Sequence, residues 1–370
     1  MKKNLHFVLA LTLGLATTVS AQDWSVDSRT RVNSIEVGTE SQTYNENLTR
    51  LGVSFGSDAV GVHLSTDYTT FLGSSDGVPA LEFTPSIHEA YVHSNVMGYG
   101  SIKAGRMALN FGSGRIIGSN DFNLGGNTWD GALIGINNNF ADLHLGYAGV
   151  SNEDTEAPAY ESSRTQLFLN VAKDFDAFSF NLIYSTDTEV ETGIEDFELT
   201  NMGLDASYAM ANGININLGY YTATNGTDSL DKDLITIGAD YAVNDQFTVH
   251  GSYDQYGDNG FYLGSGSFGN GLGSAMNYSS FVSKSNDINV GGTYKMGDFE
   301  LAGAYHMVSD EGSAPNAGDN DYNVLEASAS YKLSDNSSVM LNYSTSDQLR
   351  DSMNKAVDTN LMWLSLHIGF

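Results

Sequence analysis

The chain has 370 residues, a formal net charge of −29 and no cysteine. The acidic excess argues against a nucleic-acid partner, because phosphates are also negative, and a chain without cysteine has no disulfides to hold it together. Nothing after the N-terminal segment approaches the roughly 18 consecutive apolar residues of a membrane-spanning helix, so that class of protein is excluded. With 40 glycines, 20 tyrosines, 18 phenylalanines and 4 prolines, the composition indicates a β-rich protein.

The N-terminus has the three parts of a secretory signal peptide. Met1-Lys2-Lys3 is basic, Phe7 to Ala16 is a short apolar run, and Val19-Ser20-Ala21 places small residues before a cut. The run is too short to span a bilayer as an anchor. We therefore predict that residues 1–21 are a signal peptide that is removed, and that residues 22–370 form a single domain.

The rest of the chain alternates strand-like stretches with turns, and the count is about 18, in accord with the even strand number of an outer-membrane barrel. The predicted strands are residues 24–36, 47–56, 59–70, 87–95, 99–111, 128–138, 140–150, 163–173, 175–187, 199–211, 213–224, 232–243, 246–256, 285–296, 298–308, 322–333, 337–346 and 360–370.

Every second connection between these strands is a tight turn, such as Asn212-Gly213 or Gly297-Asp298, and the others are longer and polar. Short turns on one side and long loops on the other are typical of outer-membrane barrels, with the short turns and both termini in the periplasm. A soluble β-sandwich does not require this regularity. The predicted fold is therefore an all-β, transmembrane antiparallel β-barrel of about 18 strands, located in the bacterial outer membrane.

Tyrosines recur at matched heights on the apolar faces of the predicted strands. One set, Tyr208, Tyr241, Tyr294 and Tyr331, lies just before the short turns, and a second set, Tyr184, Tyr220, Tyr253, Tyr305 and Tyr343, lies further along the outgoing strands. Two belts of aromatic residues at the membrane interfaces explain this spacing. Ordinary hairpin aromatics in a soluble sheet leave the matched heights unexplained.

The last ten residues, Leu361 to Phe370, alternate apolar and polar side chains and end on an aromatic residue. A strand at the chain end exposes a sheet edge unless another strand pairs with it, and in a barrel that partner is the first strand. The pattern resembles the signal by which outer-membrane barrels are recognised for assembly. The partners expected are therefore the barrel-assembly machinery, through Phe370, together with outer-membrane lipid and lipopolysaccharide.

Alternation predicts that several charged side chains on the early strands point into the lumen. These are Asp27, Arg29, Arg31, Arg50, His63, Asp67 and, on the strand at 163–173, Arg164 with Gln166 and Asn170. The arginines either bind anionic or hydroxyl-rich solutes or pair with Asp27, Asp67 or Asp130 to satisfy charge. The sequence leaves both readings open.

The segment from Lys103 to Ile136 carries the most distinctive pattern. It contains Gly105-Arg106 in a predicted strand, then Gly112-Ser113-Gly114-Arg115-Ile116-Ile117-Gly118 and later Trp129-Asp130. About 30 residues here resemble the alginate-export family of outer-membrane barrels, whose fold has 18 strands. The resemblance implies equivalent roles for Arg106, Arg115 and Asp130, with Arg115 on a loop near the pore. Alternation puts Arg106 on the face of Ile102 and Ala104 unless a bulge intervenes.

The charge balance departs from that family, because a conduit for alginate, a polyanion, needs a lumen rich in cations. This chain has 16 basic and 45 acidic residues, an excess that repels a uronate polymer at low salt. The predicted function is a passive, porin-like channel for hydrophilic solutes, including oligo- or polysaccharides such as alginate, with a constriction made by a loop and arginines. The candidate pore-lining residues are Arg29, Arg31, Arg50, Arg106, Arg115, Asp130 and Arg164.

Two other classes remain as alternatives. A barrel enzyme of the lipase or protease type needs a nucleophile with a general base, for which His250 and His306 are candidates without a local signature. A structural or adhesive barrel needs a filled lumen, which small residues such as Gly291 and Ser328 do not provide.

We expect no catalytic residue, metal or cofactor. Whether the loop at residues 257–284 plugs or gates the pore is open; its Gly264 to Gly269 pattern lacks the strand and helix of a dinucleotide site.

Overall fold

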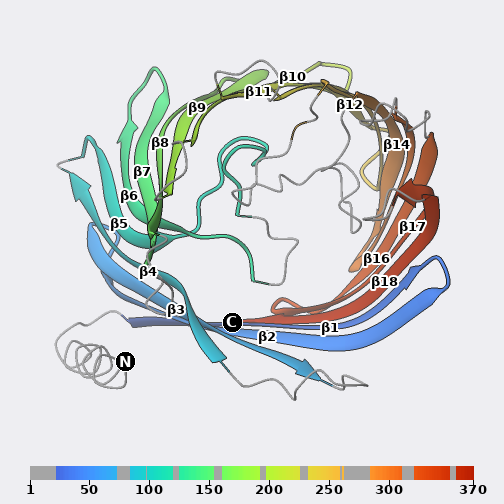
Figure 1. The fold of residues 1–370 in the computed structure, drawn as a ribbon, viewed down its shortest axis with the longest axis horizontal. Helices are drawn as coiled ribbons and strands as arrows, with labels where there is room; N and C mark the ends of the chain where they lie inside the picture. Colours follow the sequence, from blue (N-terminus) through green and yellow to red (C-terminus); the bar gives the residue numbers. More distant parts are fainter. Residues whose placement is uncertain are drawn as a thin grey trace.

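A single sheet of 18 antiparallel strands closes on itself in the computed structural model (Figure 1). The structure describes residues 22–72, 84–96, 98–119, 125–153, 161–191, 197–225, 232–258, 261, 284–310, 321–350 and 356–370. The predicted signal peptide and the Gly264 to Gly269 pattern lie outside these residues. No helix within the described ranges is long and apolar enough to cross a membrane.

The strands follow chain order around the barrel, and each pairs with the strands before and after it. Their bounds are β1 Gln22–Val37, β2 Glu40–Ser57, β3 Val60–Leu72, β4 Thr84–Val96, β5 Gly100–Met107, β6 Trp129–Asn137, β7 Asp142–Glu153, β8 Glu161–Asp174, β9 Phe178–Glu191, β10 Phe197–Ala209, β11 Ile214–Thr224, β12 Lys232–Ala242, β13 Phe247–Tyr256, β14 Ser285–Met296, β15 Phe299–Asp310, β16 Tyr322–Ser334, β17 Ser337–Arg350 and β18 Ala356–Gly369.

The first and last strands close the barrel. β1 and β18 pair from Asp27 opposite Gly369 to Val37 opposite Thr359, and the backbone of Phe370 both accepts from and donates to Val26, at 2.7 and 2.9 Å. This closure leaves no open edge, as lipid requires. The predicted pairing of the C-terminal strand with the first strand is confirmed.

The predicted strand number is confirmed, but the ends of several strands differ from the prediction, among them those of β2 and β5. β2 begins at Glu40 and joins β1 through the tight turn Gly38-Thr39, so this extracellular connection is short where the polar composition of residues 37–46 predicted a loop. β5 ends at Met107 instead of continuing to residue 111, because the N–H of Ala108 donates to the Glu89 carboxylate (2.9 Å) and the chain leaves the sheet.

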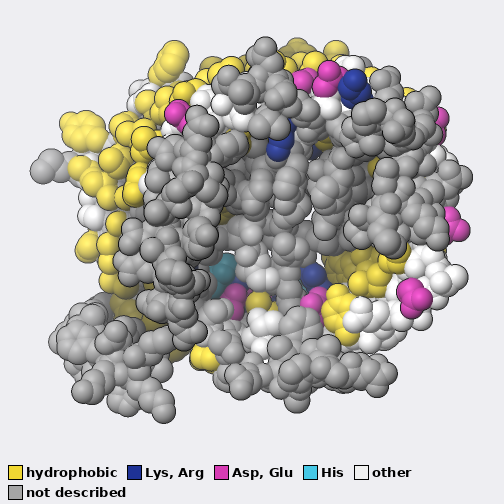
Figure 2. Space-filling view, in the orientation of Figure 1, with side chains coloured by type: hydrophobic (Ala, Val, Ile, Leu, Met, Phe, Trp, Pro, Cys, Tyr) yellow, Lys and Arg dark blue, Asp and Glu magenta, His cyan; other side chains and the backbone are white. Residues whose placement is uncertain are grey.

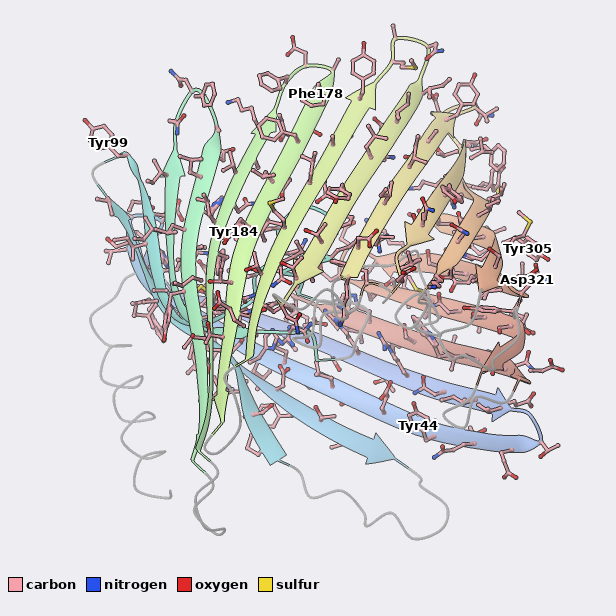
Figure 3. All side chains as sticks on the ribbon, turned by 45° about the horizontal axis from the view of Figure 1, so that its top comes forward. Tyr44, Tyr99, Phe178, Tyr184, Tyr305 and Asp321 are labelled. Atoms are coloured by element: carbon pink, nitrogen blue, oxygen red, sulfur yellow. The ribbon has the colours of Figure 1, made fainter. Side chains whose placement is uncertain are left out.

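The alternation of side chains follows the predicted faces. In β11, Leu218 and Tyr220 are 49% and 46% exposed on the outer face, while Tyr221 between the exposed positions is 2% exposed inside. Hydrophobic side chains are visible along the left and upper outer rim of the barrel in Figure 2. Figure 3 shows Tyr99 and Phe178 at the tips of short-turn hairpins and Tyr184 further along the wall.

The outer face gives a direct test of the membrane orientation. We expect Leu218→Lys to lower the free energy of unfolding by about 2–4 kcal/mol, because the substitution puts a charge on the lipid-facing wall between the two aromatic belts. Unfolding by denaturant in lipid vesicles measures the change. Asn217→Lys, one residue away and facing the lumen, is the matched control. Equal losses in the two variants would contradict the assignment of faces.

Candidate functional site

The connection between β5 and β6 turns into the barrel instead of continuing outward. In Figure 1 this segment, drawn in teal, runs across the interior toward the opposite wall. Its described residues are 108–119 and 125–128, and we call them the crossing loop. Because it lies across the lumen, it narrows the path that any solute takes.

Glycines allow the tip of the crossing loop to fold tightly. Gly112 and Gly114 have φ angles of 57° and 74°, a region that glycine adopts without steric cost. A Cβ at Gly112 would lie 2.2 Å from the Asp205 carboxylate, so a larger residue there would displace this carboxylate. The N–H of Phe111 donates to the carbonyl of Ile117 (3.0 Å) and closes the tip.

The tip binds the inner wall through polar contacts. The N–H of Ser113 donates to Asp205 Oδ2 of β10 at 3.1 Å, and Ser113 Oγ lies 2.8 Å from the hydroxyl of Tyr221 on β11. Tyr221 in turn donates to Asp205. These three residues form a closed hydrogen-bonded set, which fixes the tip against β10 and β11.

Arg115 extends this contact to β13. Its Nη2 lies 3.4 Å from Asp254 Oδ2, with both side chains largely buried, and its guanidinium lies 5.6 Å from the centre of the Tyr221 ring. Burial opposes the charged form, but Tyr256 and Asp254 outweigh it and raise the pKa of Arg115 above its ordinary value. The guanidinium is therefore charged and its position is set by the wall.

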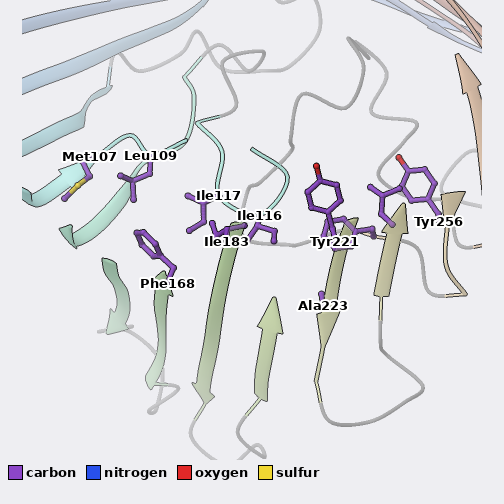
Figure 4. Packing of buried hydrophobic residues seen from close by; sticks show 11 residues of the cluster. Met107, Leu109, Ile116, Ile117, Phe168, Ile183, Tyr221, Ala223 and Tyr256 are labelled. Atoms are coloured by element: carbon purple, nitrogen blue, oxygen red, sulfur yellow. The ribbon is translucent and has the colours of Figure 1, made fainter. Parts of the chain in front are cut away.

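Apolar packing supports the same docking. Residues of β5 and the crossing loop pack in one cluster (Figure 4) with apolar residues of the wall and with Phe261, which lies between β13 and β14. The members are Met107, Leu109, Ile116 and Ile117 against Phe168, Ile183, Tyr221, Ala223, Leu234 and Tyr256 of the wall. Burial of an isoleucine contributes about 1.5–3 kcal/mol. Alternation predicted a lumen lined throughout by small and polar residues. The structure differs, because an apolar patch on the inner wall packs against the loop.

The returning end of the crossing loop is held at the opposite wall. Arg50 of β2 donates through Nη2 to the carbonyl of Gly125 at 2.6 Å and forms a two-point ion pair with Asp67 of β3, at 2.7 and 2.9 Å. His88 of β4 lies 3.6 Å from the same carboxylate. Two arginines, Arg115 and Arg50, therefore connect the loop to walls on the two sides of the lumen.

The structure pairs the inward arginines whose side chains it describes. Arg29 binds Asp27 (2.8 Å), Arg50 binds Asp67, and Arg115 binds Asp254. Arg31 lies over the ring of Trp363, 4.6 Å from its centre. Of the two readings that the sequence left open, this placement favours charge pairing over a row of cations free for solutes. Arg164 lies on β8, but its side chain is outside the described residues.

Arg106 and Asp130 lie on the outer face, contrary to the prediction that they line the pore. Arg106 binds Asp130 through two hydrogen bonds of 2.7 Å and donates to the carbonyl of Ile87. The pairing of β4, β5 and β6 runs without a register shift, so no bulge turns Arg106 inward. Met107, the next residue, faces the lumen.

A cavity of about 710 Å³ lies between the tip of the crossing loop and the short turns. Its charged lining residues are Arg115 and four aspartates, Asp174, Asp205, Asp240 and Asp254. Asp205, Asp254 and Tyr221 were not among the residues predicted from the sequence to line the pore. The available signal was Tyr221, a large aromatic residue at an inward position, which indicated a contact inside the lumen.

The residues considered for other chemistries are placed as follows. His306 of β15 is fully buried and lies 2.8 Å from Asp287, and His250 lines the cavity. Within the described residues, no cluster of three or more histidines and carboxylates could hold a metal ion. Of the loop at 257–284, the structure describes 257, 258, 261 and 284, so a plug or gate there is not tested.

A closed barrel with a lipid-facing apolar surface and an inward loop across a polar lumen defines an outer-membrane channel. The family model of the Gram-negative porins matches residues 9–351. The chain therefore belongs to the Gram-negative porins, which are channels of the bacterial outer membrane and not enzymes.

Solved structures of Pseudomonas aeruginosa porins share the fold. OccK1 (OpdK) matches with a TM-score of 0.69 and 15% identity, covering 94% of this chain and 99% of that one. OpdL matches with a TM-score of 0.71 and 11% identity, covering 95% of this chain and 99% of that one. The structure of OpdK with vanillate matches with a TM-score of 0.70 and 15% identity, covering 94% of this chain and 99% of that one. No curated protein matches the chain.

The docking of the loop is tested through Arg115. The chain has no cysteine, so Ile117→Cys introduces a single thiol at a fully buried position. We expect a water-soluble maleimide to label this thiol at least about tenfold faster when Arg115→Met is added, because loss of the ion pair leaves Asp254 buried without its cation and frees the tip.

Arg106→Met is the matched control for that experiment, since it removes an arginine from the outer face. We expect it to leave the labelling rate unchanged. If Arg106→Met accelerates labelling as much as Arg115→Met does, the contacts of Arg115 do not hold the loop.

Proposed function

We propose that this porin passes small hydrophilic solutes and prefers cationic and neutral ones to anions. The path runs past the crossing loop and through the cavity beneath it. The observation that carries the proposal is the charge of this cavity, where one arginine faces four aspartates. That arginine is already paired with Asp254, so the remaining carboxylates set the local field.

The physical basis is focusing of that field by the narrow lumen. Charges that line a narrow, low-dielectric path raise the local concentration of the opposite ion. The screening length is about 10 Å at 0.1 M salt, so the preference is strongest in dilute salt. A cation is attracted on its way past Asp205 and Asp240, and an anion is repelled.

Alginate fits this field poorly. The resemblance to the alginate-export family motivated the expectation of a saccharide channel, but such a conduit needs cations that are free to meet uronates. The described lumen arginines are engaged with Asp27, Asp67, Asp254 and Trp363. Small neutral saccharides remain within the proposal, and a polyuronate does not.

Other expectations from the sequence complete the proposal. Residues 1–21 direct export and are removed, Phe370 is read by the barrel-assembly machinery, and lipopolysaccharide surrounds the extracellular half of the wall. The exposed aromatic and aliphatic side chains of the outer face support contact with the acyl chains of lipid.

The ion preference is measured as the reversal potential of the refolded barrel in a planar bilayer with a salt gradient. We expect cations to be more permeant than anions. Asp240→Asn should lower the permeability ratio about twofold, because two unit charges about 8 Å apart in water interact by about 0.5 kcal/mol. Glu300→Gln, which removes a carboxylate outside the lining of the cavity, is the control.

Three results would contradict the proposal. An anion preference in wild type would reverse its sign. Block of the current by alginate or by vanillate, but not by a cationic solute, would point to an anion channel. Insertion without any conductance would show that the lumen is closed.

A further inference from the structure

Strand β4 contains one residue more than its partner β3 where the two pass the crossing loop. Ser65 of β3 pairs with Glu89. The next residue of β3, Thr66, pairs with Ile87, so the register shifts by one residue at this point. His88 is therefore the extra residue of a β-bulge, in which two residues of one strand oppose one residue of the other.

The bulge turns two consecutive side chains into the lumen. In a regular strand, neighbouring side chains point to opposite faces, so only one of His88 and Glu89 would face inward. Here Nδ1 of His88 lies 3.6 Å from Oδ2 of the inward Asp67. Oε2 of Glu89 lies 3.6 Å from Nε2 of the inward His63. The bulge thus places two polar groups where the two-residue period provides one.

The Glu89 carboxylate holds the departing end of the crossing loop. Its Oε1 accepts from the N–H of Ala108 at 2.9 Å, where the chain leaves β5. His63 lies beside this carboxylate, and its own Nδ1 lies 2.9 Å from Oγ of Ser54. The N–H of Glu89 donates to Oγ of Ser65 (3.1 Å), so both the side chain and the backbone have partners at the bulge.

His88 lies at the returning end of the same loop. Asp67 beside it forms the two-point ion pair with Arg50, and Arg50 donates to the carbonyl of Gly125 at 2.6 Å. The imidazole also lies next to the loop itself, since a Cβ added at Gly126 would lie 3.8 Å from its Cε1. His88 is 8% exposed. Its ring is therefore packed between Asp67 and the loop.

We propose that the bulge in β4 positions the crossing loop at both ends, with Glu89 as the positioning residue of the departing end and His88 as that of the returning end. Two residues that are adjacent in the chain thereby fix two ends of the loop that are separate in sequence. The inference rests on the proposed path of solutes past the crossing loop, and it adds the residues that set the position of the loop on that path.

The departing end is tested with a single thiol at Leu109, which is 8% exposed and follows Ala108. We expect Glu89→Leu to raise the rate at which a water-soluble maleimide labels Leu109→Cys at least about tenfold, because the N–H of Ala108 loses a charged acceptor. Glu89→Gln is the conservative variant. Its side-chain carbonyl still accepts from this N–H, so we expect it to restore slow labelling.

The returning end is tested by deleting His88. The deletion leaves the other pairings of β3 and β4 as they are, so the ladder becomes regular and no other side chain changes face. We expect the open-channel current in a planar bilayer to fluctuate with a variance at least about twofold that of the wild type, because the loop opens locally more often without this contact. His88→Ala, which keeps the chain length and removes the imidazole, is a second variant for which we expect the same result.

Deletion of Leu333 is the matched control for that experiment. Leu333 is the extra residue of another register shift, between β16 and β17, where the described residues make no contact with the crossing loop. We expect its deletion to leave the variance of the current unchanged. Circular dichroism of each refolded variant checks that the barrel has formed.

Each outcome decides the matter. Unchanged labelling of Leu109→Cys in Glu89→Leu, or unchanged variance in both His88 variants, would overturn the proposal. It would also be wrong if Glu89→Gln accelerated labelling as much as Glu89→Leu, or if deletion of Leu333 raised the variance as much as deletion of His88, because the effect would then be one on the barrel as a whole. Failure of the proposed function is seen separately, as a wild-type channel without cation preference.

Discussion

The constraint on which the whole structure depends is that lipid offers no hydrogen bonds to a polypeptide backbone. Eighteen strands satisfy it by pairing in chain order, and β1 closes on β18. Once the sheet is closed, the two-residue period decides the position of every side chain in the wall. Leucine, isoleucine and tyrosine face the acyl chains, and the alternate residues are free to be polar. The chemistry of this protein is therefore confined to the interior and to the segments that enter it.

The most consequential of those segments is the crossing loop, which is held by few cations. Arg115 and Arg50 each connect the loop to the barrel wall and to a carboxylate, Asp254 and Asp67 respectively. In a chain with 45 acidic and 16 basic residues, engaging arginines in structure leaves the uncompensated charge of the lumen negative. The same ion pairs that position the constriction thus underlie the proposed preference for cationic and neutral solutes.

The sequence predicted the strands well because their signal is local. Alternation, turn residues and the tyrosines at matched heights each involve neighbours in the chain, and together they determined strand number and faces. Arg115 was predicted to lie on a loop near the pore from the resemblance of its glycine and arginine pattern to the alginate-export family. Its partners were not, because Ser113 and Arg115 meet Asp205, Tyr221 and Asp254 from 92, 108 and 139 residues away.

The errors have physical reasons of the same kind. β5 was predicted to be too long because residues 108–111 have strand-like character, and the contact of Ala108 with Glu89 that ends it is not local. β2 was predicted to be too short because its first residues are polar on both faces, beyond the membrane. Arg106 was assigned to the pore on resemblance, although its alternation with Ile102 indicated the outer face.

The central claim is that the crossing loop, and not the barrel wall, sets the size of the pore. Replacing residues 109–127 by a short glycine and serine connection tests it most directly, since the pairing of β5 with β6 does not include these residues. The account predicts a single-channel conductance several times that of the wild type, with weaker ion preference. An unchanged conductance in a correctly folded barrel would contradict it.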